Sequence, residues 1–93
     1  MNVIFSILKE HKQELFDNYP IKSLALFGSY SRGDYSKESD VDVMVELSEP
    51  NAYKFIDLGY HLEKILNKKV DLVSKNGVKT KYFDCFKSEL LYV

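Results

Sequence analysis

Two aspartates stand two residues apart in a run of valines, in the stretch DVDVMV. Because side chains on a strand alternate between its faces, Asp40 and Asp42 project from one face while Val41, Val43 and Val45 take the other. Neighbouring carboxylates repel, and in a partly buried site one of them would normally hold a proton. Mg²⁺ removes this conflict, since it binds one or two carboxylates together with substrate phosphates. The pair therefore predicts a metal–nucleotide site that its ligand completes.

Other polar residues fit the same chemistry. Asp71, on another predicted strand, is a candidate third carboxylate. Gly28 ends an apolar run, where a glycine lets the backbone approach a ligand; the N–H groups that follow, with the hydroxyl of Ser29, can hold phosphate oxygens. Arg32, one turn further on, can pair with phosphate or brace the acidic cluster. Each feature alone is common on protein surfaces, and it is their joint order and spacing that points to a site.

The elements that must position these residues follow from the periodicity of the apolar side chains. Strands are predicted over residues 22–27, 40–46 and 69–73. Helices are predicted from Ile4 to Leu15 with a stop at Pro20, within 29–35, from Ser48-Glu49-Pro50 to near Asn67, and around Tyr82, Phe83, Phe86 and Leu90. Strands that alternate with helices predict an α/β or α+β domain in which a small sheet is backed by helices.

Length and composition bound the function. The 93 residues suit a single domain, 1–93, with one hydrophobic core. Because 13 Lys and Arg stand against 14 Asp and Glu, there is no global positive field, which disfavours a nucleic-acid partner. Cys85 is the only cysteine, which fits a reducing compartment. No stretch has the length of a membrane span, and the first residues become charged too soon for a signal peptide, so we expect a cytoplasmic protein.

The remaining reactive side chains favour packing or surface roles. His11 falls on the apolar stripe of the first predicted helix and His61 is isolated in the third, and neither has a second ligand at metal spacing. Cys85, among aromatic residues, is expected to be a small core hydrophobe. The seven tyrosines and six phenylalanines exceed what a small core needs, which indicates an aromatic surface for a partner.

The ordered motifs resemble a known family. Gly28-Ser29, Arg32-Gly33 and Ser39-Asp40-Val41-Asp42 are similar to the signature of the polymerase-beta-like nucleotidyltransferase superfamily, above all its minimal nucleotidyltransferase (MNT) branch. The likeness covers nearly the whole chain, including KKVDLVS around Asp71. It implies the nucleotidyltransferase fold, a mixed sheet backed by helices. It also implies ATP as donor and transfer of a nucleoside monophosphate with release of pyrophosphate.

The same resemblance implies a role for each site residue. Asp40 and Asp42 would hold two Mg²⁺ ions, and Asp71 would complete the ion nearest the acceptor and take its proton. Gly28 and Ser29 would hold the β- and γ-phosphates.

Proteins of this branch and size are similar to antitoxins encoded beside a HEPN-domain ribonuclease toxin. The resemblance implies that the chain adenylylates a tyrosine of such a toxin within a hetero-oligomer. Two alternatives stay open. The first is a catalytically silent antitoxin that masks the toxin, against which the presence of all three aspartates argues. The second is nucleotidyl transfer to a small molecule such as an aminoglycoside, although those relatives usually carry an added helical domain.

Overall fold

A four-stranded mixed sheet forms the centre of the computed structural model, which describes residues 3–78 and 80–93. The strands are β1 (Ile21–Phe27), β2 (Val41–Leu47), β3 (Val70–Ser74) and β4 (Leu91–Tyr92), in the order β3-β2-β1-β4. β1 runs antiparallel to β2 and β4, whereas β2 and β3 are parallel. A parallel pair needs a crossover connection, which a long helix provides here. The predicted mixed sheet backed by helices is confirmed.

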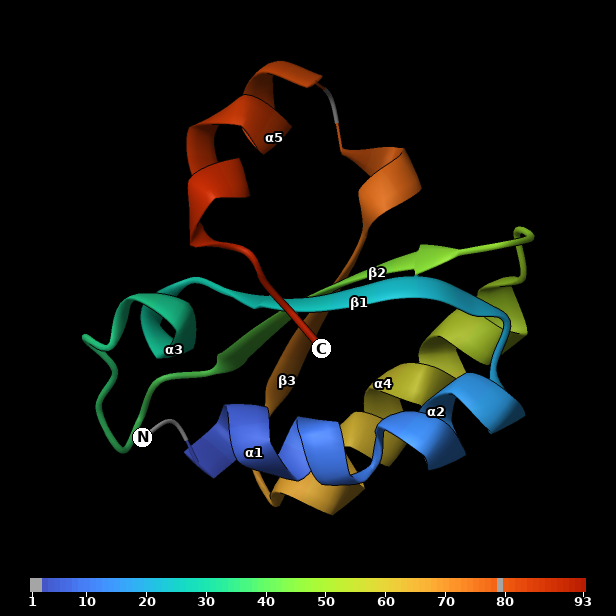
Figure 1. Ribbon diagram of the computed structural model, residues 1–93, viewed down its shortest axis with the longest axis horizontal. Helices are drawn as coiled ribbons and strands as arrows, with labels where there is room; N and C mark the ends of the chain where they lie inside the picture. Colours follow the sequence, from blue (N-terminus) through green and yellow to red (C-terminus); the bar gives the residue numbers. More distant parts are fainter. Residues whose placement is uncertain (1–2, 79) are drawn as a thin grey trace.

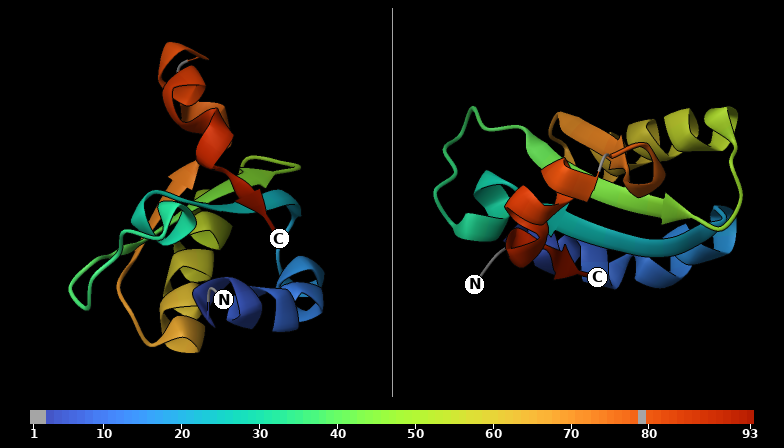
Figure 2. Two further views of the ribbon diagram at one scale, coloured as in Figure 1. Left: turned by 60° about the vertical axis from the view of Figure 1, so that its left-hand side comes forward. Right: turned by 90° about the horizontal axis from the view of Figure 1, so that it is seen from above.

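Helices cover one face of this sheet, and the C-terminal segment stands on the other. The helices are α1 (Val3–Glu10), α2 (Lys12–Asn18), α3 (Ser29–Arg32), α4 (Ala52–Leu66) and α5 (Thr80–Phe86), with 3-10 helices η1 (Lys75–Gly77) and η2 (Lys87–Glu89) on either side of α5. α1, α2 and α4 lie together on one side (Figure 1), and the turned view shows α5 on the opposite side (Figure 2). Within the described ranges no helix is long and apolar enough to cross a membrane.

The alternation along β2 decides which face carries the polar residues. Val41, Val43 and Val45 are fully buried in the main hydrophobic cluster. Fully buried leucines from the covering helices complete it: Leu8, Leu15, Leu58 and Leu62. Burying a side chain of this size stabilises a fold by about 1.5–3 kcal/mol. Because the valines take the helix-covered face, Asp42 projects from the opposite face, on the side of α5.

Local capping corrects two of the predicted helix boundaries. The single helix predicted from Ile4 to Leu15 is wrong, because the chain breaks at His11 and forms α1 and α2. The start predicted at Ser48-Glu49-Pro50 is also wrong, because α4 begins at Ala52. Its N-cap is Asn51, whose side chain accepts the backbone N–H of Lys54 at 3.1 Å. The predicted end near Asn67 is confirmed, and this residue takes the left-handed conformation of a C-cap.

The C-terminal region departs most from the sequence prediction. The helix predicted as far as Leu90 ends at Phe86, and after η2 the chain forms β4, which no sequence pattern announced. β4 pairs Leu91 with Leu26 and Tyr92 with Ala25 at the edge of the sheet.

Cys85 is exposed, so its expected role in the core is wrong. The reason is that α5 stands on the less covered side of the sheet, where one short helix buries few of its own side chains.

His61 is also not isolated, contrary to expectation. Its Nδ1 lies 2.9 Å from the hydroxyl of Tyr19 and its Nε2 lies 2.7 Å from a carboxylate oxygen of Glu14. The histidine therefore connects α4 to α2 and to the residue that follows α2.

Leu58→Ala is expected to lower the free energy of unfolding by about 2–5 kcal/mol, since it leaves a cavity beneath the sheet. The matched control is Ile56→Ala on the same helix, where the side chain is 53% exposed. The free energy of unfolding of this variant should fall by only about 0.5 kcal/mol. Urea denaturation of both variants checks this. Equal losses in the two variants would contradict the placement of the core.

Candidate active site

The strand directions bring the predicted site residues together at one end of the strands. Because β1 is antiparallel to β2 and β2 is parallel to β3, the end of β1 lies beside the starts of β2 and β3. Phe27 at the end of β1 pairs with Asp42, and Asp42 pairs with Asp71. Gly28 follows Phe27 directly. Residues from three distant stretches of the sequence are therefore neighbours in space.

Gly28 makes the turn from β1 into α3 and touches the acidic cluster. Its φ of +72° is a left-handed conformation that favours glycine, and its carbonyl oxygen accepts the N–H groups of Ser31 and Arg32, both at 3.0 Å. A Cβ added at this position would overlap the carboxylate of Asp42 and lie 3.0 Å from its Cγ. The absent side chain therefore leaves the space in which the Asp42 carboxylate lies.

The three predicted carboxylates differ in their position on the strands and in their exposure. Asp42 and Asp71 are partners on adjacent parallel strands, which run about 4.8 Å apart, and their side chains share one face. Asp40 lies just before the first residue of β2, and it is exposed, as is Asp71, whereas Asp42 is half-buried. In the parts of the chain that the structure describes, no three His, Cys, Asp or Glu side chains form a ready metal-ligand set. An incomplete set of carboxylates suits Mg²⁺ that arrives with phosphates.

The electrostatics of this cluster reflect crowded negative charge. Burial raises the pKa of the Asp42 carboxyl, and the nearby charges of Asp71 and Asp40 raise it further, while Arg32 acts in the opposite direction. Arg32, the positive charge that acts on Asp42, is itself engaged by Asp34 and Glu89. A bound cation would therefore favour their ionised forms.

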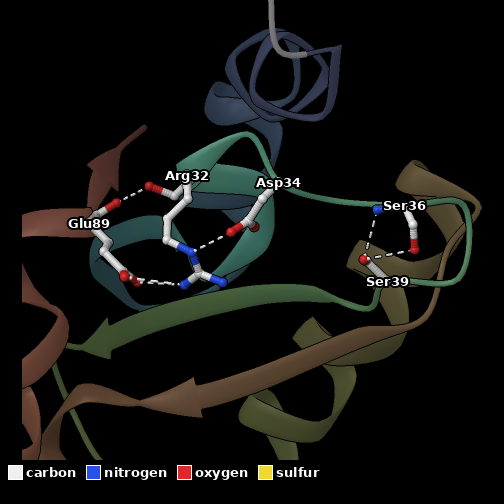
Figure 3. A network of polar contacts seen from close by, with 6 residues as sticks. Arg32, Asp34, Ser36, Ser39 and Glu89 are labelled. Carbon is white, nitrogen blue, oxygen red and sulfur yellow. Dashed lines mark hydrogen bonds and ion pairs between the residues drawn. The ribbon is translucent and has the colours of Figure 1, made fainter.

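Arg32 is held by carboxylates of the chain itself (Figure 3). Its Nε donates to Asp34 at 3.0 Å, and its Nη1 donates to the two carboxylate oxygens of Glu89 at 3.1 and 3.3 Å. The hydroxyl of Ser31 donates to the backbone carbonyl of Glu89. These contacts tie α3 to η2, so the C-terminal segment braces the helix that follows the Gly28 turn. Glu89 lies 57 residues from Arg32, and no local sequence signal pointed to it.

The loop that leads into β2 is shaped by two serines (Figure 3). The hydroxyl oxygen of Ser39 accepts the backbone N–H of Ser36 at 2.9 Å and lies 3.3 Å from the Ser36 hydroxyl. This turn leads to Asp40, which lies just before the start of β2. Ser29, by contrast, is the half-buried first residue of α3, and its predicted contact with phosphate stays a prediction.

Comparison with known proteins places the chain in a protein family. The family model described as a nucleotidyltransferase domain matches residues 8–91. A candidate protein adenylyltransferase of Methanocaldococcus jannaschii is 51% identical over 79 residues, which cover 84% of this chain and 92% of that protein. The protein adenylyltransferase MntA of Thermococcus cleftensis is 41% identical over 91 residues, covering 97% of this chain and 92% of that protein.

Solved structures share the fold. A toxin–antitoxin complex with AMP-PNP contains a chain with a TM-score of 0.66 and 26% identity, and the match covers 80% of this chain and 62% of that one. The complex of a tri-AMPylated Shewanella oneidensis HEPN toxin with its MNT antitoxin gives a TM-score of 0.70 at 23% identity, over 96% of this chain and 70% of that one.

Gly28→Ala is expected to displace the Asp42 carboxylate, because the added methyl group occupies the same space. If the acidic cluster takes a metal–nucleotide, as the sequence predicts, this variant should bind ATP with Mg²⁺ more weakly than wild type. Gly33→Ala is the matched control: its φ is +91°, but a Cβ there meets nothing within 4 Å. It should cost about 1–2 kcal/mol of stability through backbone strain alone and leave binding intact. Isothermal titration calorimetry and thermal unfolding separate the two effects; similar ATP affinities for both variants would refute the steric account.

Asp42→Asn is expected to stabilise the metal-free protein at neutral pH. Because the folded-state pKa of Asp42 is raised above its unfolded value, the wild-type carboxyl favours the fold only while it is protonated. This stabilisation is fully present at pH values below the pKa that Asp42 has in the unfolded chain. It is lost as the pH rises through the raised pKa that Asp42 has in the folded protein. The neutral amide does not titrate, so the melting temperature of the variant should exceed that of wild type at pH 7, and the difference should shrink toward pH 3. A pH series of thermal melts in EDTA checks this, and a lower melting temperature for Asp42→Asn at pH 7 would contradict it.

Proposed function

The chain belongs to the nucleotidyltransferase domain family, and from that premise we propose that it transfers AMP from ATP, with Mg²⁺, to a tyrosine of a HEPN-domain toxin and thereby acts as its antitoxin. The observation that supports this most directly is the Asp42 carboxylate beside Asp71 and against the Gly28 turn. Carboxylates on one side and a close-approach backbone turn on the other suit a metal-bound triphosphate.

Each site residue then has a task. The carboxylates of Asp40, Asp42 and Asp71 hold Mg²⁺, which when bound neutralises phosphate charge and stabilises the entering and leaving oxygens of an in-line displacement. The Gly28 turn and the Ser29 hydroxyl hold the β- and γ-phosphates, with Arg32 nearby. Asp71 accepts the proton of the acceptor hydroxyl while that oxygen bonds to the α-phosphorus and the bond to pyrophosphate breaks.

The acceptor and the partner are proposed by likeness. A relative that spans 97% of this chain is named a protein adenylyltransferase, and a chain of the same fold occurs in a complex with a tri-AMPylated HEPN toxin. A bound ATP analogue is named for another structure of this fold. The single cysteine, free in the structure, agrees with a cytoplasmic site of action.

Exposed side chains on α4 support a protein partner. Tyr53, Ile56 and Tyr60 follow one another at helical spacing and are 84%, 53% and 69% exposed. Exposed aromatic side chains of this kind are enriched at protein–protein interfaces. α4 covers the sheet face opposite Asp42, so a partner bound there would leave the acidic cluster open.

The decisive measurement is transfer of label from ATP radiolabelled at the α-phosphate to a HEPN-domain protein co-expressed with this chain. With Mg²⁺ the wild type is expected to label the toxin, and Asp42→Ala should lower the rate by about 1,000-fold or more because a metal ligand is lost. Glu49→Ala, which removes an exposed carboxylate before α4, is the control and should keep the wild-type rate.

Protection of cells separates catalysis from masking. If Asp42→Ala fails to protect cells from the toxin although the complex still forms, transfer is the antitoxic step. Protection equal to wild type would favour the silent, masking antitoxin instead. Absence of label on the toxin in the wild-type reaction would overturn the proposed acceptor.

A further inference from the structure

A tyrosine, a histidine and a glutamate form a hydrogen-bonded relay away from the acidic cluster. The hydroxyl of Tyr19, the residue that follows α2, lies 2.9 Å from Nδ1 of His61 on α4. Nε2 of His61 lies 2.7 Å from a carboxylate oxygen of Glu14 on α2. The rings of Tyr19 and His61 also meet edge to face, with centroids 5.6 Å apart.

In the neutral tautomer of His61 that carries its proton on Nε2, Glu14 accepts that N–H and the lone pair of Nδ1 faces the Tyr19 hydroxyl. The same hydroxyl lies 3.5 Å from the backbone carbonyl oxygen of Asp57. A hydroxyl hydrogen-bonded to an imidazole that a carboxylate orients is the arrangement of a base-activated nucleophile. Burial and the neighbouring Asp57 and Glu14 raise the pKa of the Tyr19 hydroxyl, so it keeps its proton at neutral pH and needs a base to release it.

The relay cannot serve the chain's own acidic cluster. Tyr19 belongs to the layer of α1, α2 and α4, whereas Asp42 projects from the opposite face of the sheet. A nucleotide bound at Asp42 therefore does not reach the Tyr19 hydroxyl of the same chain. Reaction at Tyr19 requires the active site of another molecule, and the half-buried side chain lies at the surface where one can approach. Lys54, whose Nζ is 5.8 Å from the centre of the Tyr19 ring, offers a positive charge to an incoming phosphate.

We propose that Tyr19 is a modification site, adenylylated by the active site of a second copy of this chain. The oxygen of Tyr19 bonds to the α-phosphorus of ATP held by that copy, and the bond from this phosphorus to pyrophosphate breaks. For this acceptor the phenolic proton goes to Nδ1 of His61, in place of Asp71 of the copy that holds ATP. The inference rests on the proposed function, because it uses the same transfer to a tyrosine, and it names this chain as an additional acceptor.

Exposure alone predicts a different pattern of modification. Tyr53 and Tyr60 are 84% and 69% exposed, far more than Tyr19, but the structure gives neither of them a histidine partner. If access alone governed reaction, these tyrosines would be labelled first. If the relay governs it, Tyr19 is labelled instead.

The test incubates the full chain with ATP and Mg²⁺ without toxin and maps adenylyl groups by peptide mass spectrometry. Tyr19 is expected to carry the group, and Asp42→Ala alone should carry none. Mixing Asp42→Ala as acceptor with Tyr19→Phe as donor should restore the label on the Asp42→Ala chain, which proves transfer between copies. Label on Tyr53 or Tyr60 in place of Tyr19 would overturn the proposal.

Variants of the relay separate activation from packing. His61→Asn is expected to slow labelling of Tyr19 by about 100-fold or more, since a general base contributes about 10²–10⁴ to a rate, while labelling of the toxin continues. Lys22→Ala, which changes an exposed residue of β1 that pairs with Glu46 outside the relay, is the control and should leave both reactions unchanged. Should His61→Asn fail to fold, Glu14→Gln keeps an acceptor for Nε2 without its charge and is expected to slow labelling of Tyr19 alone.

The two proposals fail separately. Labelled toxin with unlabelled Tyr19 rejects self-modification and keeps the transferase function. No label on either protein rejects both.

Discussion

The position of the Asp42 carboxylate is the constraint on which the rest of the site depends. It lies against the backbone of Gly28, beside Asp71 on the adjacent strand, and half-buried. Burial and like charge both oppose its ionisation, so the fold sustains this arrangement at the expense of its own stability. A protein that only needed to fold would gain from an apolar residue here. The arrangement makes physical sense for a site that a cation and phosphates complete.

The mixed sheet is what allows these residues to meet. An antiparallel β1 delivers Gly28 to the starts of two parallel strands, and the crossover through α4 places β3 beside β2. With α1, α2 and α4 on one face, the other face of the sheet is left for the C-terminal segment (Figure 2), and Asp42 projects from it. That segment is tied back to the Gly28 turn through Glu89, Ser31 and Arg32, so distant parts of the chain support one another around the acidic cluster.

Short-range patterns explain why much of the fold was predictable. The alternation of valines and aspartates from Asp40 to Val45 sets both the strand and its two faces, because side-chain direction on a strand depends only on position. A glycine at the end of an apolar run likewise indicates a close backbone approach, here to Asp42. The break at His11 and β4 escaped prediction because periodicity continues through His11 and two residues of strand are too few for a pattern. The Asn51 cap is a local contact with Lys54, and the prediction missed it by placing the helix start at the preceding Ser48-Glu49-Pro50.

The sequence by itself determined the order of the principal strands and helices and the family resemblance, and it predicted the candidate site residues, since motifs and periodicity are local properties of the chain. Only the tertiary structure decided which residues became partners: Asp71 with Asp42, Glu89 with Arg32, and Tyr19 with His61 and Glu14. The physical reason is that each pairing joins residues 29 to 57 positions apart or bridges separate helices, and such contacts depend on strand direction, helix rotation and packing.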